Sequence, residues 1–339
     1  MRVLLTGGTG FLGSHLARAL LQNGHETALL VRSPDKVTRI FGADLARRFE
    51  IVAGDMTDEQ AVSRAVRGRH AVIHAAALVA LERKHAARVL HENRRGIEIV
   101  VGSAAAAGIE RMLYVSSVVA LCQAGQPSIT TETLGDATGS AYMRSKVECE
   151  LFVRSLQATG SPIRTTYPAA VLGPDDPGLS EANRGVLAFF RDAPIVTDTG
   201  LQMVDVRDVA AAHMRLLEAP TGAGRHMLGG HFLPWARLVD LLEEITGRKL
   251  RRFPIPGAIL RASGVVADVV KHVWDFQFPL SHEAMRFMTQ WVPVEATPAD
   301  NLFTFRDPRV TLSDTLRWLS AAGHLPADRL GQLRLDAPP

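Results

Sequence analysis

The chain has 339 residues, of which 47% are hydrophobic and 22% are charged, and its mean hydropathy is +0.07. This composition provides a substantial buried core, so it excludes a disordered chain and a small disulfide-stapled domain. The 38 Lys and Arg residues against 35 Asp and Glu residues give a formal charge of +3. Because the basic residues are scattered along the chain, we expect no nucleic-acid partner.

Cysteine usage and hydropathy bear on the compartment. Cys122 and Cys149 are too few for a disulfide framework and form no CxxC pair, which is typical of a reducing compartment. Glycines interrupt the N-terminal apolar stretch after a few residues, so we expect no secretory signal and a cytoplasmic location. The longest apolar tract, residues 255–273, contains charged residues, so we expect no stable membrane insertion. It is expected to pack on the core; a helix that covers a pocket or touches a membrane surface is the alternative.

A glycine-rich turn stands at the beginning of the chain. An apolar strand at residues 3–5 runs into three glycines at intervals of three, and a helical pattern follows to residue 22. Gly7 permits the tight turn, Gly10 lets the backbone approach a pyrophosphate, and Gly13 allows close packing of helix on strand. Free amides at the start of the helix then face the phosphates. This context predicts a dinucleotide site.

Short apolar runs alternate with helical patterns through the first half of the chain, which indicates βαβ units. We therefore expect an α/β fold, namely a Rossmann-type doubly wound parallel sheet with a smaller, mostly helical C-terminal substrate lobe. The expected strands are residues 3–5, 27–31, 49–52, 71–74, 112–116 and 163–167.

The domain boundaries are expected to interleave. Residues 1–172 are assigned to the nucleotide-binding domain, with 204–219 returning to it as a strand edge and a helix. Residues 173–203 and 220–330 are assigned to the substrate-binding lobe, and 331–339 to a loose tail. Helices are expected in the lobe at 235–247 and 312–322.

Tyr142 and Lys146 are four residues apart in a helical stretch, so they share one face of the helix. The ammonium of Lys146 is expected to lower the pKa of Tyr142, which suits acid/base chemistry. Ser116 and Ser117 end the strand at 112–116, and strand ends of this kind form the ligand crevice. A hydroxyl there can bind a carbonyl oxygen. The alternatives are a solvated helix face and serines that cap a turn.

Taken together, these motifs resemble the extended short-chain dehydrogenase/reductase family over at least residues 1 to about 220. The sequences of residues 167–174 and 310–319 resemble those of its dihydroflavonol 4-reductase-like branch. The matching motifs, in chain order, are Thr6 to Gly13, Gly54-Asp55-Met56, His74-Ala75-Ala76-Ala77, Asn93 before Gly96, Ser116-Ser117, Tyr142 to Lys146, and Val204 to Ala210.

The resemblance implies a role for each matching residue. Ser117 corresponds to the catalytic hydroxyl, Tyr142 to the acid/base, Lys146 to the activator that also binds the ribose, and Asn93 to the active-site asparagine. Cofactor contacts are expected for Gly7, Thr9, Gly10, Phe11, Leu12, Gly13, Arg32, Ser33, Asp55, Met56, Ala75, Ala76, Ala77, Lys146, Tyr167 and Pro168.

The end of the second strand bears on cofactor choice. Arg32 and Ser33 stand where an acidic residue would hold the ribose 2′-hydroxyl of NAD, and a guanidinium suits a 2′-phosphate. NADP(H) is therefore the preferred cofactor. NAD(H) is the alternative, with Arg32 solvated and Asp35 on the ribose.

Together these features predict an enzyme that reduces a ketone or aldehyde group of an apolar small molecule. The expected substrate is of the dihydroflavonol, cinnamoyl or steroid kind. Ala169 and Ala170 stand where sugar-nucleotide members usually carry an asparagine. Apolar residues within 179–203 suit a greasy substrate, although residues at such spacings also form cores. The alternatives are an NAD-dependent sugar-nucleotide epimerase/dehydratase and a non-catalytic NADP(H)-sensing protein. The expected partner is a small-molecule carbonyl substrate, with a homodimer as a family-level expectation.

No metal is expected, because His282-Glu283 lacks a second histidine at ligand spacing.

Overall fold

A parallel seven-stranded sheet forms the larger part of the molecule, with the strand order β10-β6-β5-β4-β1-β2-β3. The computed structural model describes residues 1–80, 83–123, 125–137, 139–191, 194–270, 289–296 and 302–334. The strands are β1 (Arg2–Thr6), β2 (Glu26–Val31), β3 (Glu50–Ala53), β4 (Ala71–His74), β5 (Arg111–Val115), β6 (Ile163–Pro168) and β10 (Gly224–Leu228). The expected doubly wound parallel sheet is confirmed.

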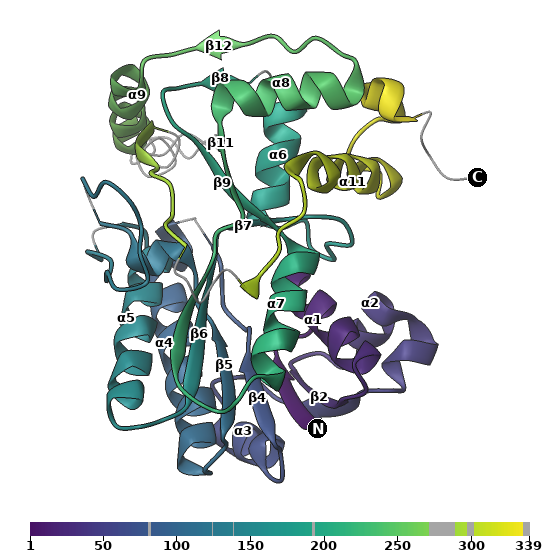
Figure 1. The fold of residues 1–339 in the computed structure, drawn as a ribbon, viewed down its shortest axis with the longest axis vertical. Helices are drawn as coiled ribbons and strands as arrows, with labels where there is room; N and C mark the ends of the chain where they lie inside the picture. Colours follow the sequence, from purple (N-terminus) through teal and green to yellow (C-terminus); the bar gives the residue numbers. More distant parts are fainter. Residues whose placement is uncertain are drawn as a thin grey trace.

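Helices cover both faces of this sheet (Figure 1). In β1, Leu4 and Leu5 point to opposite faces and both are fully buried, as required of a strand between two helical layers. Leu5 packs in one cluster with Leu16 and Val209, whereas Leu4 packs in another with Ile97. The first layer is α1 (Phe11–Gln22), α2 (Asp35–Ala46) and α7 (Val206–Glu218), and the second is α3 (Glu59–Val66), α4 (Ala86–Ala106) and α5 (Ala141–Ala158).

A smaller lobe lies beyond the carboxyl ends of the strands (Figure 1). Its core joins Leu172, Trp235 and Leu316 from three different elements. Its strands are β7 (Ala170–Leu172), β8 (Ile195–Val196), β9 (Gly200–Asp205), β11 (His231–Pro234) and β12 (Phe253–Pro254), and its helices are α6 (Glu181–Arg191), α8 (Trp235–Thr246), α9 (Gly257–Val270) and α11 (Pro308–Ala321). Short 3₁₀ helices complete the described elements, namely η1 (Arg83–His85), η2 (Val118–Leu121) and η4 (Ala327–Arg334).

One strand, and the last two residues of another, lie in a different sheet from the one that we expected. Strand β10 pairs with β6 in the large sheet, although residues 220–330 were assigned to the lobe. Conversely, β9 belongs to the lobe sheet, in the order β11-β9-β7, and only α7 returns to the nucleotide-binding domain. The physical reason is the edge of β6, whose backbone groups gain a parallel partner once α7 has crossed the sheet.

The C-terminal segment packs further than we expected. Leu330 and Leu333 are buried in the lobe core, so the tail is held at least to residue 334. Residues 335–339 lie outside the described part.

The apolar tract at 255–273 forms α9 up to residue 270, and its last residues lie outside the described part. Leu260 is buried, whereas Ile259 is 60% exposed. Within the described ranges, no helix combines the length and the apolar character needed to cross a bilayer.

Candidate active site

The start of α1 is shaped to accept an anion. Gly7 has φ +76°, and a Cβ there would lie 2.7 Å from the backbone of Ala75, while a Cβ on Gly13 would collide with the carbonyl of Gly7. The N-cap residue Gly10 makes no side-chain cap, as is also true of the N-caps of α2, α4 and α8. Side-chain caps are made by Ser140 on α5, Asp58 on α3, Asp205 on α7 and Asp307 on α11. The first amides of α1 are therefore left for a ligand, and they fit a pyrophosphate.

A buried hydrogen-bond chain holds the end of β4 beside this turn. The hydroxyl of Thr6 accepts a hydrogen bond from the amide of Ala76 at 3.3 Å and lies 2.8 Å from Nδ1 of His74. Burial, with a smaller contribution from the charge of Lys146, lowers the pKa of His74 to about 3. His74 is therefore neutral, and the segment of Ala75 to Ala77 follows it, with the backbone of Ala75 and Ala76 against Gly7.

The expected adenosine end of the site lies between β2 and β3. The Nε atom of Arg32 lies 3.7 Å from the Oδ2 atom of Asp55, and the Arg32 side chain is 61% exposed. The other oxygen of Asp55 accepts hydrogen bonds from the amide and hydroxyl of Thr57 at 2.9 and 2.7 Å. Met56 packs against Gly96, where a Cβ would lie 2.7 Å from its sulfur. Asp55 is thus held in place, whereas Arg32 projects into solvent.

The structure brings Tyr142 and Ser117 together. Ser140 caps α5 through a 3.2 Å hydrogen bond from the amide of Met143, which places Tyr142 in the first turn of the helix. The Ser117 hydroxyl lies beside Tyr142, where it acts to lower the pKa of Tyr142, and it accepts a 3.4 Å hydrogen bond from the amide of Val119. Ser117 therefore both caps a short turn and contacts Tyr142.

The protonation of Tyr142 differs from the expectation. Burial raises the pKa of Tyr142 to about 12, and the hydrogen bond from Ser117 offsets only part of this effect. Burial outweighs the expected lowering by Lys146, whose Nζ atom lies 5.9 Å from the centre of the Tyr142 ring. The Tyr142 hydroxyl is consequently protonated at neutral pH and is a proton donor.

Lys146 is buried at the end of β5. Its side chain is among the buried charged groups at 3% exposure, and its Nζ atom donates a 3.2 Å hydrogen bond to the carbonyl of Val115. The same atom lies 5.3 Å from the centre of the Tyr114 ring. Burial lowers the pKa of Lys146, while Cys149 and Glu150 oppose this shift.

The side-chain amide of Asn93 forms hydrogen bonds with the elements around the site. Its oxygen accepts a 2.7 Å hydrogen bond from the amide of Leu78, and its nitrogen donates to the carbonyl of Leu78 at 3.0 Å and to the hydroxyl of Ser145 at 3.0 Å. Asn93 is 4% exposed. It therefore connects α4 to the segment after β4 and to α5, and its amide makes no contact with Tyr142 among these bonds.

The side chain of Tyr167 contacts the helix that carries Tyr142 and Lys146. It is fully buried, and its hydroxyl donates a 2.5 Å hydrogen bond to Glu150. Sequence reasoning missed Glu150 and its partner Arg154. The signal available was an acidic residue one helical turn after Lys146, on the face that the Tyr142 and Lys146 spacing assigns to the site.

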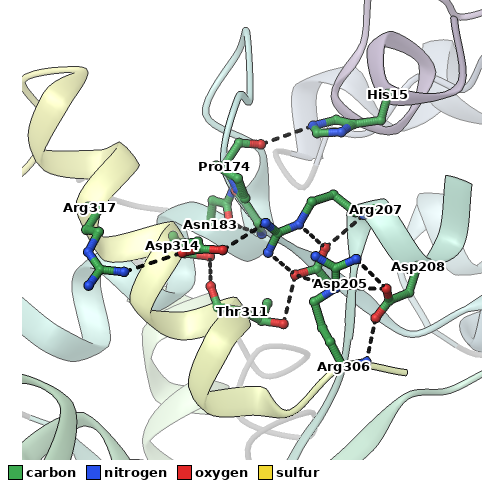
Figure 2. Close-up of polar contacts among 12 residues, drawn as sticks. His15, Pro174, Asn183, Asp205, Arg207, Asp208, Arg306, Thr311, Asp314 and Arg317 are labelled. Carbon is green, nitrogen blue, oxygen red and sulfur yellow. Dashed lines mark hydrogen bonds and ion pairs between the residues drawn. The ribbon is translucent and has the colours of Figure 1, made fainter. Parts of the chain in front are cut away.

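Figure 2 shows the polar junction between the two parts of the molecule. The buried carboxylate of Asp205 accepts hydrogen bonds from Arg207 and from the hydroxyl of Thr311, and Arg207 also donates to Asp314 at 2.8 Å. Arg306 donates to Asp208 at 2.8 Å. The C-terminal segment is thereby fastened to the start of α7.

A second contact across the junction begins in α1. The Nε2 atom of His15 lies 3.1 Å from the carbonyl oxygen of Pro174, and a carbonyl requires a donor at that nitrogen (Figure 2). Burial lowers the pKa of His15. The helix that begins at the glycine-rich turn thus touches the loop between β7 and α6.

Within the described part of the chain, no group of three or more His, Cys, Asp or Glu residues could hold a metal ion. The pair His282-Glu283, considered above, lies outside the described residues. Cys122 and Cys149 are free thiols.

Comparison with known proteins follows this geometry. The sequence profile of the NAD dependent epimerase/dehydratase family matches residues 3–228. A protein of Synechocystis named for dihydroflavonol 4-reductase is 30% identical over 260 residues, covering 74% of this chain and 74% of its own. A ceramide reductase of Caulobacter vibrioides is 28% identical over 340 residues, covering 96% of each chain.

Among solved structures, a UDP-glucose-4-epimerase of Stenotrophomonas maltophila with bound NAD superimposes with a TM-score of 0.74, covering 95% of this chain and 99% of its own. At 20% sequence identity this similarity concerns the fold alone. With the profile match and the glycine-rich turn, the chain belongs to the NAD dependent epimerase/dehydratase family and is an NAD(P)-dependent oxidoreductase of the short-chain dehydrogenase/reductase type.

Proposed function

We propose that this chain is an NADP-dependent reductase that converts a ketone or aldehyde of an apolar small molecule into the alcohol. The observation that carries the proposal is the arrangement of Tyr142, Ser117 and Lys146 at the carboxyl end of β5, with Tyr142 protonated. A protonated tyrosine beside a second hydroxyl is suited to donate a proton to a carbonyl oxygen.

The residues divide the reaction between them. The Ser117 hydroxyl donates a hydrogen bond to the carbonyl oxygen and polarises the C=O bond. Tyr142 transfers its proton to that oxygen as the C–H bond forms, and the ammonium of Lys146 stabilises the tyrosinate that results. The bound nicotinamide supplies the hydride, and Asn93 keeps α4, α5 and the segment after β4 in register.

The choice of NADP rests on Arg32. Its guanidinium lies at the end of β2, is 61% exposed, and is 3.7 Å from its nearest acidic oxygen on Asp55. An exposed pair at this distance contributes little, so the guanidinium is available to a phosphate dianion. The neighbouring Ser33 adds a hydroxyl.

Two observations support an apolar substrate. Relatives carry the names dihydroflavonol 4-reductase and ceramide reductase, and Ala169 and Ala170 replace the polar side chain that would grip a diphosphate. The apolar residues of α6 add little support, because Leu187 and Phe190 are buried in the lobe core.

The test is NADPH oxidation with a panel of ketones and aldehydes on hydrophobic scaffolds, with one alcohol formed for each NADPH consumed. Tyr142→Phe should lower turnover by about 10²- to 10⁴-fold and leave NADPH binding intact. Full activity of Tyr142→Phe would contradict the mechanism.

The same experiment separates the alternatives. Tightly retained NAD and interconversion of sugar nucleotides without net nicotinamide turnover would favour an epimerase. NADPH-dependent binding of a partner, with no carbonyl reduced, would favour a sensor.

A further inference from the structure

Glu150 is a buried acid that the chemistry proposed above does not use. It follows Lys146 by one turn of α5, and its side chain is 0% exposed. Its carboxylate accepts hydrogen bonds from the hydroxyl of Tyr167 at 2.5 Å, from Nε of Arg154 at 2.8 Å and from the hydroxyl of Ser116 at 3.4 Å. Burial of a carboxylate is costly even when it is paired, so simple packing of α5 gives no reason for one here.

The position of Glu150 adds a third contact between α5 and the end of β5. Tyr142 lies beside Ser117, Lys146 donates a hydrogen bond to the carbonyl of Val115, and Glu150 accepts one from the hydroxyl of Ser116. Three successive turns of the helix are thus each fixed to one of three consecutive residues at the end of the strand. A shift of α5 along β5 would break the contact of Glu150 together with that of Tyr142.

Arg154 extends the same connection to the smaller lobe. Its guanidinium donates to the carbonyl oxygens of the loop before α5 at 3.0 Å (Thr131), 3.2 Å (Glu132) and 2.8 Å (Thr133). The loop is also bonded to residues 293 and 295, because Ile129 exchanges backbone hydrogen bonds with them at 3.1 and 2.8 Å. Between them, the amide of Val294 donates a 3.3 Å hydrogen bond to Gln202 on the lobe strand β9. The pair of Glu150 and Arg154 therefore lies between the catalytic helix and this contact.

The ionisable groups that face Lys146 show why the charge of Glu150 affects its protonation. From α5 it faces Tyr142, Cys149 and Glu150, from β5 Tyr114, and from β4 His74. Burial keeps His74 neutral and raises the pKa of both Tyr114 and Tyr142, and it raises the pKa of Cys149 to about 11. These neighbours are therefore uncharged at neutral pH, and Glu150 supplies the formal negative charge that favours the ammonium.

From this geometry we propose that Glu150 is a positioning residue, which places a negative charge one helical turn from Lys146 and holds α5 in register with the end of β5. The inference rests on the proposed function for its assignment of Lys146 to the cofactor ribose and to Tyr142. The charge of Arg154 partly offsets that of Glu150, so the effect of Glu150 on Lys146 is moderate.

The experiment compares Glu150→Gln and Glu150→Asp with Glu148→Gln in the full-length protein. Glu148 lies on the same helix and is 40% exposed, 3.9 Å from Arg94. For each variant, NADPH affinity is measured by nicotinamide fluorescence from pH 6 to 10, and kcat is measured over the same range.

Removal of the charge should make Lys146 lose its proton at lower pH, because burial then acts on it unopposed by the carboxylate. We expect Glu150→Gln to move the high-pH decline of NADPH affinity and of kcat about one pH unit lower. The plateau kcat should fall about tenfold through loss of register. Glu148→Gln should do neither.

Glu150→Asp separates charge from shape. It retains the charge but shortens the side chain, so the high-pH decline should stay near its wild-type position while kcat falls severalfold. This variant also decides the matter if Glu150→Gln does not fold, since wild-type kcat in Glu150→Asp would overturn the positioning role. A wild-type pH profile in well-folded Glu150→Gln, or an equal shift in Glu148→Gln, would overturn the charge role.

Failure of the reductase proposal is recognised separately. If the wild-type protein reduces no carbonyl, the reductase proposal fails. The role of Glu150 can still be tested, because the pH dependence of NADPH affinity in Glu150→Gln and its controls is measured without turnover.

Discussion

The ammonium of Lys146 donates a 3.2 Å hydrogen bond to the carbonyl oxygen of Val115, at the last residue of β5. This bond joins the helix that carries Tyr142 to the strand end that carries Ser117. It holds a charge in a place where burial opposes charge, as the lowered pKa of Lys146 indicates. Such an arrangement reduces stability in favour of function, and it leads to the first prediction.

Lys146→Met should lower turnover by about 10²- to 10⁴-fold while leaving the melting temperature unchanged or higher. Methionine removes the buried charge with little loss of apolar packing, and such replacements are often neutral or stabilising. Calorimetry and NADPH oxidation on the same preparation provide the measurement. A large drop in melting temperature would show that the ammonium stabilises the fold.

Arg32→Gln should weaken NADPH binding by about 10- to 100-fold and change NADH binding much less. The loss corresponds to one charge-assisted hydrogen bond of about 1.5 to 3 kcal/mol with the 2′-phosphate. Fluorescence titration with each cofactor measures it. Arg39→Gln, at an exposed position on α2, is the matched control and should bind both cofactors normally. Equal losses for NADPH and NADH in Arg32→Gln would refute the assignment.

The buried histidine of β4 should make the protein sensitive to acid. The pKa of His74 is about 3 in the folded chain, below its ordinary value, so between these two values the unfolded chain binds a proton that the folded chain does not. Stability therefore falls as the pH is lowered, by about 2 kcal/mol between pH 6.5 and 5 from this residue. Burial acts on His213 in the same direction and lowers its pKa to about 4.

Urea unfolding at several pH values tests this sensitivity. His74→Asn keeps an acceptor for the hydroxyl of Thr6 and should flatten the dependence of unfolding free energy on pH. His91→Asn, at an exposed position on α4, is the control. An unchanged slope in His74→Asn would assign the acid sensitivity to other groups.

Asp205→Asn should destabilise the junction by about 2 to 4 kcal/mol. Burial alone would raise the pKa of Asp205, but hydrogen bonds from Arg207 and Thr311 outweigh it and leave the pKa lowered. Asparagine keeps one oxygen for Arg207, but its NH2 group faces the donors Arg207 and Thr311 where an oxygen accepted before. Arg207 is 29% exposed, so the cost lies at the low end of that for a fully buried pair.

The measurement for this variant is the urea midpoint at pH 7. Because the folded pKa of Asp205 is lowered, its contribution in the wild-type protein is present above the ordinary Asp range and is lost as the pH falls below it. Asp314→Asn, at 28% exposure, should cost less than about 1 kcal/mol. Equal costs in the two variants would mean that burial of Asp205 adds nothing.

The sequence by itself determined the features that depend on near neighbours in the chain. The turn from Gly7 to Gly13, the shared helix face of Tyr142 and Lys146, and the strands of the first half follow from steric freedom and periodicity, which act over a few residues. The placement of Ser117 at a strand end was readable for the same reason.

Only the tertiary structure decided what depends on packing between distant segments. The hydroxyl of Tyr167 on β6 reaches Glu150 on α5, and β10 joins the large sheet after α7 has crossed it. Burial leaves Tyr142 protonated although a lysine lies one turn away on the same helix. Desolvation depends on every segment that covers a group, and no local spacing records how those segments come together.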